Sequence, residues 1–208
     1  MRVVTTLFIL LASMSLARAE PLTVEFGGQH YTVNFEDQAQ LPNGRPGGGI
    51  AEFTLAGETV DDWTKLFAYH AYPEAGDSPT RAVQTLGEIV KENNKDANFA
   101  IVEDEKTGEA IIDFLTWAPD SDIMEFDVFK YARAENGPGL VAIQYAQHIK
   151  LGDIDVEGMR ALRAKSVEYM AGTNIALARD YFAGRLKKSS AAEPQSAAPL
   201  SAHAGAER

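Results

Sequence analysis

The segment from Asn98 to Ile149 constrains the fold most, because it has the pattern of four consecutive β-strands joined by short turns. Gly, Pro, Asn and Asp residues between the apolar runs supply the chemistry of tight turns. Strands joined by such short turns pair antiparallel, so the segment predicts a meander that needs helices to cover it. The predicted strands are residues 98–103, 110–117, 123–133 and 140–149.

The N-terminal part of the mature chain adds more strands. Residues 22–26 and 30–35 are short runs of β type on either side of Gly27 and Gly28, which predicts a hairpin. Residues 41–49 are rich in Gly and Pro and are predicted to lack regular structure. A third strand is expected to begin at Ile50 and to end before Gly57.

Three helices are predicted from capping residues and apolar periodicity. Thr59, followed by Asp62, is an acidic variant of the capping box and predicts a helix that ends at Tyr72. Ser78 and Pro79 predict the start of a second helix that ends in residues 93–96. A long helix is expected over residues 156–182, and its irregular period near Gly172 leaves a kink or a two-part helix open.

These elements predict the α+β class, with a largely antiparallel sheet of about six to seven strands covered by two short helices and one long C-terminal helix. Residues 20–187 are expected to form a single domain. Residues 188–208 are rich in Ala, Ser and Pro and are expected to be a disordered tail, because they have little apolar bulk to bury.

Residues 1–19 have the pattern of a signal peptide. Met1 and Arg2 precede an apolar stretch, and Ala17 and Ala19 satisfy the small-residue rule, so cleavage is expected after Ala19. The alternative, an uncleaved anchor, needs about 20 apolar residues, which this stretch lacks. The protein is therefore expected to be periplasmic or secreted, with no stable membrane insertion after cleavage.

The charge and the absence of cysteine exclude several classes of function. Cleavage would remove two arginines and no acid, which moves the formal net charge from −11 to −13. An acidic protein is not expected to use nucleic acid or an anionic membrane surface as its main partner. The chain has no Cys, which rules out disulfides, thiolate metal sites and thiol nucleophiles.

The nearest match to a metal motif is the series Asp153, Asp155, Glu157 and Gly158, which is similar to the start of a calcium loop. The twelfth position, which should be a bidentate Glu, is Ala164. We therefore interpret Asp153 or Asp155 as the cap of the long helix, and predict no metal and no cofactor.

The histidines His30, His70, His148 and His203 have no spacing typical of metal ligands. His70 lies on the apolar stripe of the first predicted helix and is interpreted as a half-buried structural residue with one hydrogen bond. His148 is expected on the less buried face of the last strand. It could act with a carboxylate such as Asp113 or Asp127 if folding brings them together.

Trp63 and Trp117 could stack a ligand, although large aromatic residues on amphipathic elements are usually part of a core. Ser78 is accounted for by helix capping, and the chain has no G-x-S-x-G sequence around a serine nucleophile. No catalytic, cofactor-binding or metal-binding residue is therefore assigned.

Residues 53–67, which run FTLAGETVDDWTKLF, resemble a stretch of uncharacterised exported bacterial proteins. The order of the predicted elements is similar to that of the Mog1/PsbP-like fold, whose members include a photosystem II extrinsic protein and a Ran-binding protein. The resemblance implies interaction rather than catalysis, and it transfers no functional residues.

The main functional hypothesis is an exported binding or interaction protein whose partner is an unknown protein or small ligand. The alternative is a periplasmic enzyme of hydrolase type whose His and carboxylate groups meet only in the fold. A third interpretation is an envelope accessory protein whose C-terminal tail reaches a partner. A pocket with His70 or His148 beside an acid would favour the enzyme, and an apolar groove would favour binding.

Overall fold

A computed structural model describes residues 21–135 and 137–184. In this part of the chain it contains eight strands and three helices. The strands are β1 (Thr23–Phe26), β2 (Gln29–Gln40), β3 (Pro46–Thr54), β4 (Lys65–Tyr72), β5 (Asn98–Asp104), β6 (Glu109–Trp117), β7 (Ile123–Arg133) and β8 (Leu140–Lys150). The helices are α1 (Pro79–Asn93), α2 (Val156–Gly172) and α3 (Ala176–Phe182).

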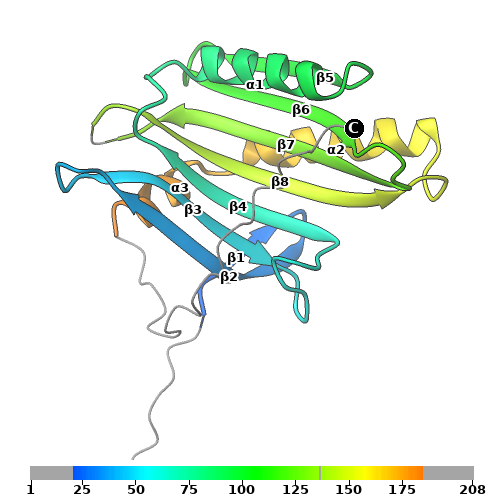
Figure 1. Cartoon of the computed structure of the whole chain (residues 1–208), viewed down its shortest axis with the longest axis horizontal. Helices are drawn as coiled ribbons and strands as arrows, with labels where there is room; N and C mark the ends of the chain where they lie inside the picture. Colours follow the sequence, from blue (N-terminus) through cyan, green and yellow to red (C-terminus); the bar gives the residue numbers. More distant parts are fainter. Residues whose placement is uncertain (1–20, 136, 185–208) are drawn as a thin grey trace, which may run out of the picture. The chain divides into compact units, whose positions relative to one another are not determined.

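The eight strands form one antiparallel sheet in the order β1-β2-β3-β4-β8-β7-β6-β5 (Figure 1). The chain builds each half of this sheet from neighbouring hairpins, and the two halves join where β4 pairs with β8. The predicted N-terminal hairpin and the four-stranded meander are confirmed. The predicted fold class is nevertheless wrong in its details, because the described residues contain an extra strand and lack the single long helix.

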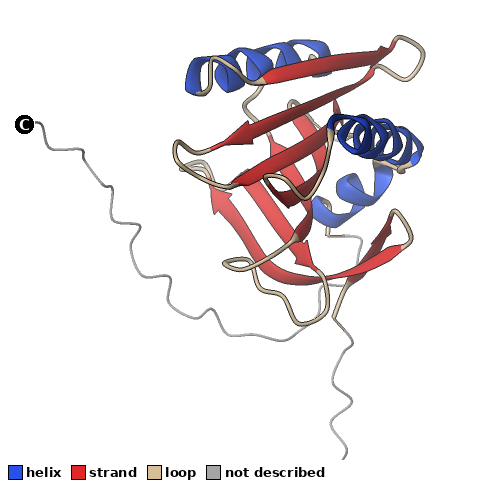
Figure 2. Cartoon of the chain, turned by 90° about the vertical axis from the view of Figure 1, so that its right-hand side faces the viewer, coloured by secondary structure: helices blue, strands red, loops and turns tan. Residues whose placement is uncertain are grey.

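The helices lie on both faces of the sheet (Figure 2). Side chains of α2 and α3, such as Met170 and Tyr181, pack against the larger apolar core on one face. Side chains of α1, such as Val83 and Val90, pack on the other face against β6 and β7. Because successive strand residues point to opposite faces, β8 contributes Ile143 to the first core and Ala142 to the second.

The first predicted helix is wrong, because residues 65–72 form strand β4 at the centre of the sheet. Phe67 and Tyr69 face the core under α2 and α3, whereas Leu66, Ala68 and His70 face the opposite side. A central strand that is covered on both faces is a continuous buried run, and its apolar pattern does not distinguish it from a helix. The capping residue Thr59 lies instead in a tight loop, where it forms a bridge with Asp62.

The prediction that residues 41–49 lack regular structure is wrong from Pro46 onward, since β3 begins there. Gly49 pairs with Gln38 on β2 and with Ala71 on β4. A Cβ atom at Gly49 would lie 2.7 Å from the ring of Phe182, so this glycine lets α3 approach the strand closely. Packing against α3 therefore accounts for a glycine within β3.

The single long C-terminal helix is wrong, because the segment divides into α2 and α3 around Thr173; this is the two-part helix that the irregular period had left open. Thr173 is the C-cap of α2, and the buried Nζ of Lys130 lies 3.1 Å from the carbonyl oxygen of Ala171 and 2.9 Å from that of Thr173. A cation that donates hydrogen bonds to the free carbonyl oxygens of a helix end stabilises that end. The irregular period near Gly172 thus marks a true helix boundary.

Helix α1 follows its prediction more closely. Ser78 is its N-cap and accepts a hydrogen bond from the backbone N–H of Arg81, and Pro79 is the first helical residue. Its apolar spacing alone would bury Ile89, yet Ile89 is 46% exposed. Gly87 lies on the buried face of α1 instead, and because it has no side chain the ring of Phe99 can pack directly against the helix.

Within the described residues, none of the helices has the length and apolar character needed to cross a membrane. The predicted signal peptide and the whole of the predicted tail lie outside the described residues. Cleavage after Ala19 and a disordered tail therefore stay predictions.

Candidate functional site

The α1-facing surface of the sheet is covered over part of its area by a loop of residues 55–64, which joins β3 to β4. Trp63 of this loop packs on the side chains of Leu66, Ala68 and Ala146. Two of these three residues are alanines, which leave room above the strands for the indole ring. Trp63 was considered as a ligand-stacking residue or as a core residue. In the structure it is partly buried and packs on the sheet.

His148 on β8 lies at the edge of this covered area. Its ring stacks on the indole of Trp63, with 3.8 Å between centroids and 15° between planes. Its Nδ1 lies 2.9 Å from the carbonyl oxygen of Trp63, and its Nε2 lies 3.4 Å from Oε2 of Glu125 on β7. The side chains of His148 and Glu125 are 34% and 39% exposed, so solvent reaches this pair.

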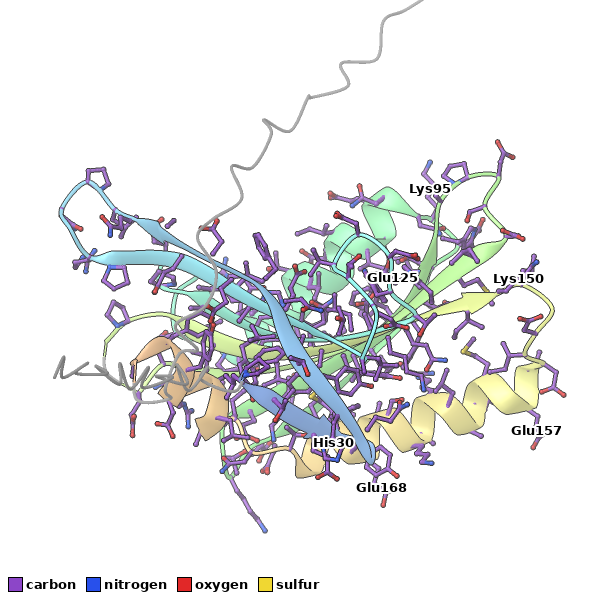
Figure 3. All side chains as sticks on the ribbon, turned by 90° about the horizontal axis from the view of Figure 1, so that it is seen from below. His30, Lys95, Glu125, Lys150, Glu157 and Glu168 are labelled. Atoms are coloured by element: carbon purple, nitrogen blue, oxygen red, sulfur yellow. The ribbon has the colours of Figure 1, made fainter. Side chains whose placement is uncertain are left out.

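The carbonyl oxygen of Trp63 only accepts hydrogen bonds, so Nδ1 of His148 carries a hydrogen. Nε2 then faces a carboxylate, and a hydrogen bond forms there only if one proton lies between the two groups. Each ring nitrogen of His148 therefore faces an oxygen that can accept a hydrogen bond. Figure 3 shows Glu125 on the side of the sheet opposite Glu157 of α2.

Asp127 lies two residues beyond Glu125 on the same strand and face, and it is buried. Burial, together with repulsion from Glu125, raises the pKa of Asp127 to about 8. Its carboxyl group also shares a side-chain hydrogen bond with Glu125. At neutral pH Asp127 therefore keeps its proton.

Gln144 on β8 connects Asp127 to His70 on β4. Its Nε2 donates to Oδ1 of Asp127 at 2.8 Å, and its Oε1 lies 2.9 Å from Nε2 of His70. Since an amide oxygen only accepts, His70 donates from Nε2. Burial lowers the pKa of His70 to about 4, so its ring is neutral at pH 7.

These contacts link five side chains on three neighbouring strands into one polar row. The row runs from a solvent-exposed end to a buried end, and its members are His148, Glu125, Asp127, Gln144 and His70. Buried polar groups in a satisfied network of this kind are held in one arrangement. His70 has the single hydrogen bond that was predicted for it, although it lies on a strand and is buried.

The structure answers whether His148 meets a carboxylate. Asp113 lies on the opposite face of the sheet, where its two carboxylate oxygens bind Nε and Nη2 of Arg163 on α2. Asp127 does not contact His148 directly; it is linked to it by Glu125, a residue that was not among the predicted partners. The hairpin of β7 and β8 places Glu125 directly opposite His148, so a predicted register would have found it.

The acidic series after β8 serves as a helix cap, as predicted. Asp155 is the N-cap of α2, and its carboxylate accepts a hydrogen bond from the N–H of Gly158 at 2.7 Å. Within residues 21–135 and 137–184, no group of three or more His, Asp or Glu side chains is arranged to hold a metal ion. Trp117, the other tryptophan, ends β6 and is 38% exposed.

A cavity of about 250 Å³ lies at the other end of the sheet, next to α3. Four charged side chains, Arg45, Glu74, Glu135 and Arg179, take part in its wall, and no histidine is found among the described residues that line it. His148 lies eight positions along β8 from Leu140 in the cavity wall, which corresponds to roughly 25 Å. Its apolar lining includes Leu41, Pro46, Pro73, Pro138, Val141 and Phe182.

The described part of the chain is thus an α+β protein with a single antiparallel sheet, a polar row that runs from His148 to His70 on one face, and an apolar cavity beside α3. A family model matches residues 19–175, and the chain belongs to this family, which is uncharacterised. No curated protein matches the chain.

Proposed function

We propose that this chain is an exported binding protein, and that the cavity beside α3 takes an apolar group of a small molecule or of a protein segment. The observation that carries the proposal is the mostly apolar wall of this cavity, which contains no histidine among its described residues. Binding sites are typically concave and apolar, with a few polar groups that orient the ligand. Arg45 and Arg179 are suited to orient an acidic group on such a ligand.

The volume sets a limit on the ligand. A cavity of about 250 Å³ lies below the usual range of about 300 to 1,000 Å³ for sites that enclose a whole drug-sized molecule. We therefore expect it to accept one aromatic or branched aliphatic group, with the rest of the ligand outside. Export to the periplasm, and the resemblance to the Mog1/PsbP-like fold, remain predictions that are compatible with such a role.

The test is to fill the cavity from within and to measure binding of anilinonaphthalene sulfonate, an apolar probe with one acidic group. Ala71→Phe places a ring in the cavity wall and should weaken binding of the probe at least tenfold. Ala100→Phe, on β5 at the far edge of the sheet, is the matched control and should bind the probe like the parent. Equal affinity of both variants would contradict the proposal.

A second function, a hydrolase-type enzyme, is favoured by one observation. The fold places His148 beside Glu125, which shares a hydrogen bond with Asp127, and a histidine next to two linked carboxyl groups is an arrangement that can transfer protons. A screen of ester, phosphate and glycoside substrates tests this function. Any activity should disappear in both His148→Gln and Glu125→Gln, and an activity that survives both variants would not belong to this row.

A further inference from the structure

The two edges of the sheet are built differently (Figure 1). At one edge, β1 has only four residues, and the part of β2 that extends beyond it contains Glu36, Asp37 and two register shifts against β3. Short strands, charges and bulges are the features by which proteins prevent an edge from pairing with another chain. The edge formed by β1 and β2 is therefore protected.

β5, at the opposite edge, has none of these features in its middle. Its seven residues pair with β6 in consecutive register, and the run from Phe99 to Val102 contains no charge and no proline. Within the described residues, no strand pairs with the other side of β5. Val102 is 51% exposed and Asn98 is exposed as well, so this edge is open to solvent. A regular apolar edge of this kind can accept a further strand.

We propose that β5 is a self-association surface, on which two copies of this chain pair their β5 strands antiparallel about a twofold axis at Ile101. Ile101 is the middle residue of the seven, so this register pairs the whole strand and sets Ala100 opposite Val102 of the second copy. Val102 pairs with the core residue Ile111, so Val102 and Ala100 lie on the face of the sheet that carries α2. The pair gains about seven backbone hydrogen bonds and covers the exposed Val102.

The charges on β5 favour a second copy in this orientation. Glu103 and Asp104 end the strand, and the antiparallel register sets them opposite the uncharged Phe99 and Asn98. A parallel pair would instead set each acid opposite itself, and like charges directly opposite each other destabilise a pair of strands. The sequence of β5 is thus complementary to itself only when the two strands run antiparallel.

The charges just outside β5 also match. Asp96 precedes the strand and Lys106 follows it; both are exposed, and each lies five positions from Ile101. The antiparallel register therefore brings opposite charges together at both ends of the pair. Exposed ion pairs contribute little energy, and the copies as a whole repel, since each has a formal net charge of −11. We therefore expect the pair to strengthen as added salt screens this repulsion.

The pair closes on itself. Its contact is isologous, so both β5 edges are used and the edges that remain are the protected ones of β1 and β2. This geometry gives a dimer rather than a fibre. One pair of strands is smaller than a standard interface of about 1,200 to 2,000 Å², so we expect a weak dimer that forms in the micromolar range.

The test measures the weight-average mass of the full chain by sedimentation equilibrium from about 1 µM to about 500 µM, at low salt and at about 0.5 M salt. We expect the mass to rise about twofold, at lower protein concentration in high salt. Val102→Lys places a charge on the exposed edge and should keep the chain monomeric throughout. Phe35→Lys, at a 41% exposed residue of the protected edge, is the matched control and should dimerise like the parent.

Single cysteines report the register, because the chain has none of its own. In the antiparallel pair a residue stands opposite itself only at Ile101, where the two Cβ atoms lie about 5 Å apart. Under mild oxidation Ile101→Cys should therefore form the disulfide-linked dimer at least about tenfold faster than Val102→Cys. Far-UV circular dichroism shows whether each variant folds, and the disulfide rates decide the register if Val102→Lys folds poorly.

The inference is independent of the cavity and of either proposed function, because it concerns only the edge of the sheet. Equal disulfide rates at the two positions would indicate a parallel pair and would contradict the proposal. It is also wrong if the chain stays monomeric over the whole concentration range, or if Val102→Lys dimerises like the parent. Loss of the dimer in Phe35→Lys alone would assign the contact to the other edge and would overturn it as well.

Discussion

Replacing Arg163 by Met should destabilise the protein in a way that depends on pH. Asp113 is 4% exposed on β6, and Arg163 of α2 holds both of its carboxylate oxygens. Burial already raises the pKa of Asp113, against the opposing effect of Arg163. Met keeps the length of the apolar stem but removes the charge, so Arg163→Met leaves a buried carboxylate without its cation.

The cost of this change has an upper limit, because Asp113 can take up a proton instead of staying charged. Holding a carboxyl of ordinary pKa near 4 in its neutral form costs about 4 kcal/mol at pH 7 and about 1.5 kcal/mol at pH 5, at about 1.4 kcal/mol per pH unit. The side chain of Arg163 is 46% exposed, so water replaces part of its effect. We therefore expect a loss of about 2 to 3 kcal/mol at pH 7 and of about 1 kcal/mol at pH 5.

The direction follows from the raised pKa of Asp113. A carboxyl group whose pKa is higher in the folded state stabilises that state at low pH, and this contribution is lost as the pH rises. Urea denaturation of parent and variant at both pH values measures the difference. Arg163→Met combined with Asp113→Leu should unfold within about 1 kcal/mol of the parent, because no buried charge remains. A pH-independent loss, or a double variant as unstable as the single one, would refute the reasoning.

Three further changes test other contacts. His70→Leu leaves the side-chain amide oxygen Oε1 of Gln144 without a donor, and urea denaturation at pH 7 should show a loss of about 1 to 2 kcal/mol. Because the pKa of His70 is lowered to about 4, the parent should lose stability from about pH 6.5 to pH 4 and the variant should not, so the difference between them should shrink in acid. Lys130→Met removes the cation that caps α2 and that pairs with Glu109 at 2.8 Å, so it should cost about 3 kcal/mol, with faster hydrogen exchange in the last turn of the helix. Gly139→Ala, at φ +104° with Pro73 2.5 Å from the new Cβ, should cost at least about 3 kcal/mol by thermal denaturation, whereas Gly108→Ala, at φ +69° in open space, should cost about 1 kcal/mol.

Much of the sheet could be predicted because its signals are local. The strands of the meander alternate and are separated by turn residues, so their number and antiparallel pairing follow from neighbouring residues. The caps Ser78 and Asp155 act within three residues of their own position, at Arg81 and at Gly158. A cap of this kind is recognisable without knowledge of the rest of the fold.

Strand β4 was misread because its surroundings are set by the rest of the chain. The residues Leu66 to Ala71 fit the apolar pattern of a helix and that of a strand buried on both faces equally well. They form a strand because β3 and β8 supply backbone hydrogen-bond partners on both sides. The close approach of α3 to Gly49 and the capping of α2 by Lys130 likewise join residues that are distant in the sequence. Local propensity contains no information on such contacts.

The polar row depends on tertiary structure in the same way. The sequence alone determined that His148 lies on the less buried face of a strand and that Asp127 was one of its possible acidic partners. The pairing of β7 with β8 decided that Glu125 stands opposite His148, and the pairing of β4 with β8 brought His70 to Gln144 across 74 positions of the chain. Hydrogen bonds between side chains need groups within about 3 Å, and only the packed sheet brings these residues to that distance.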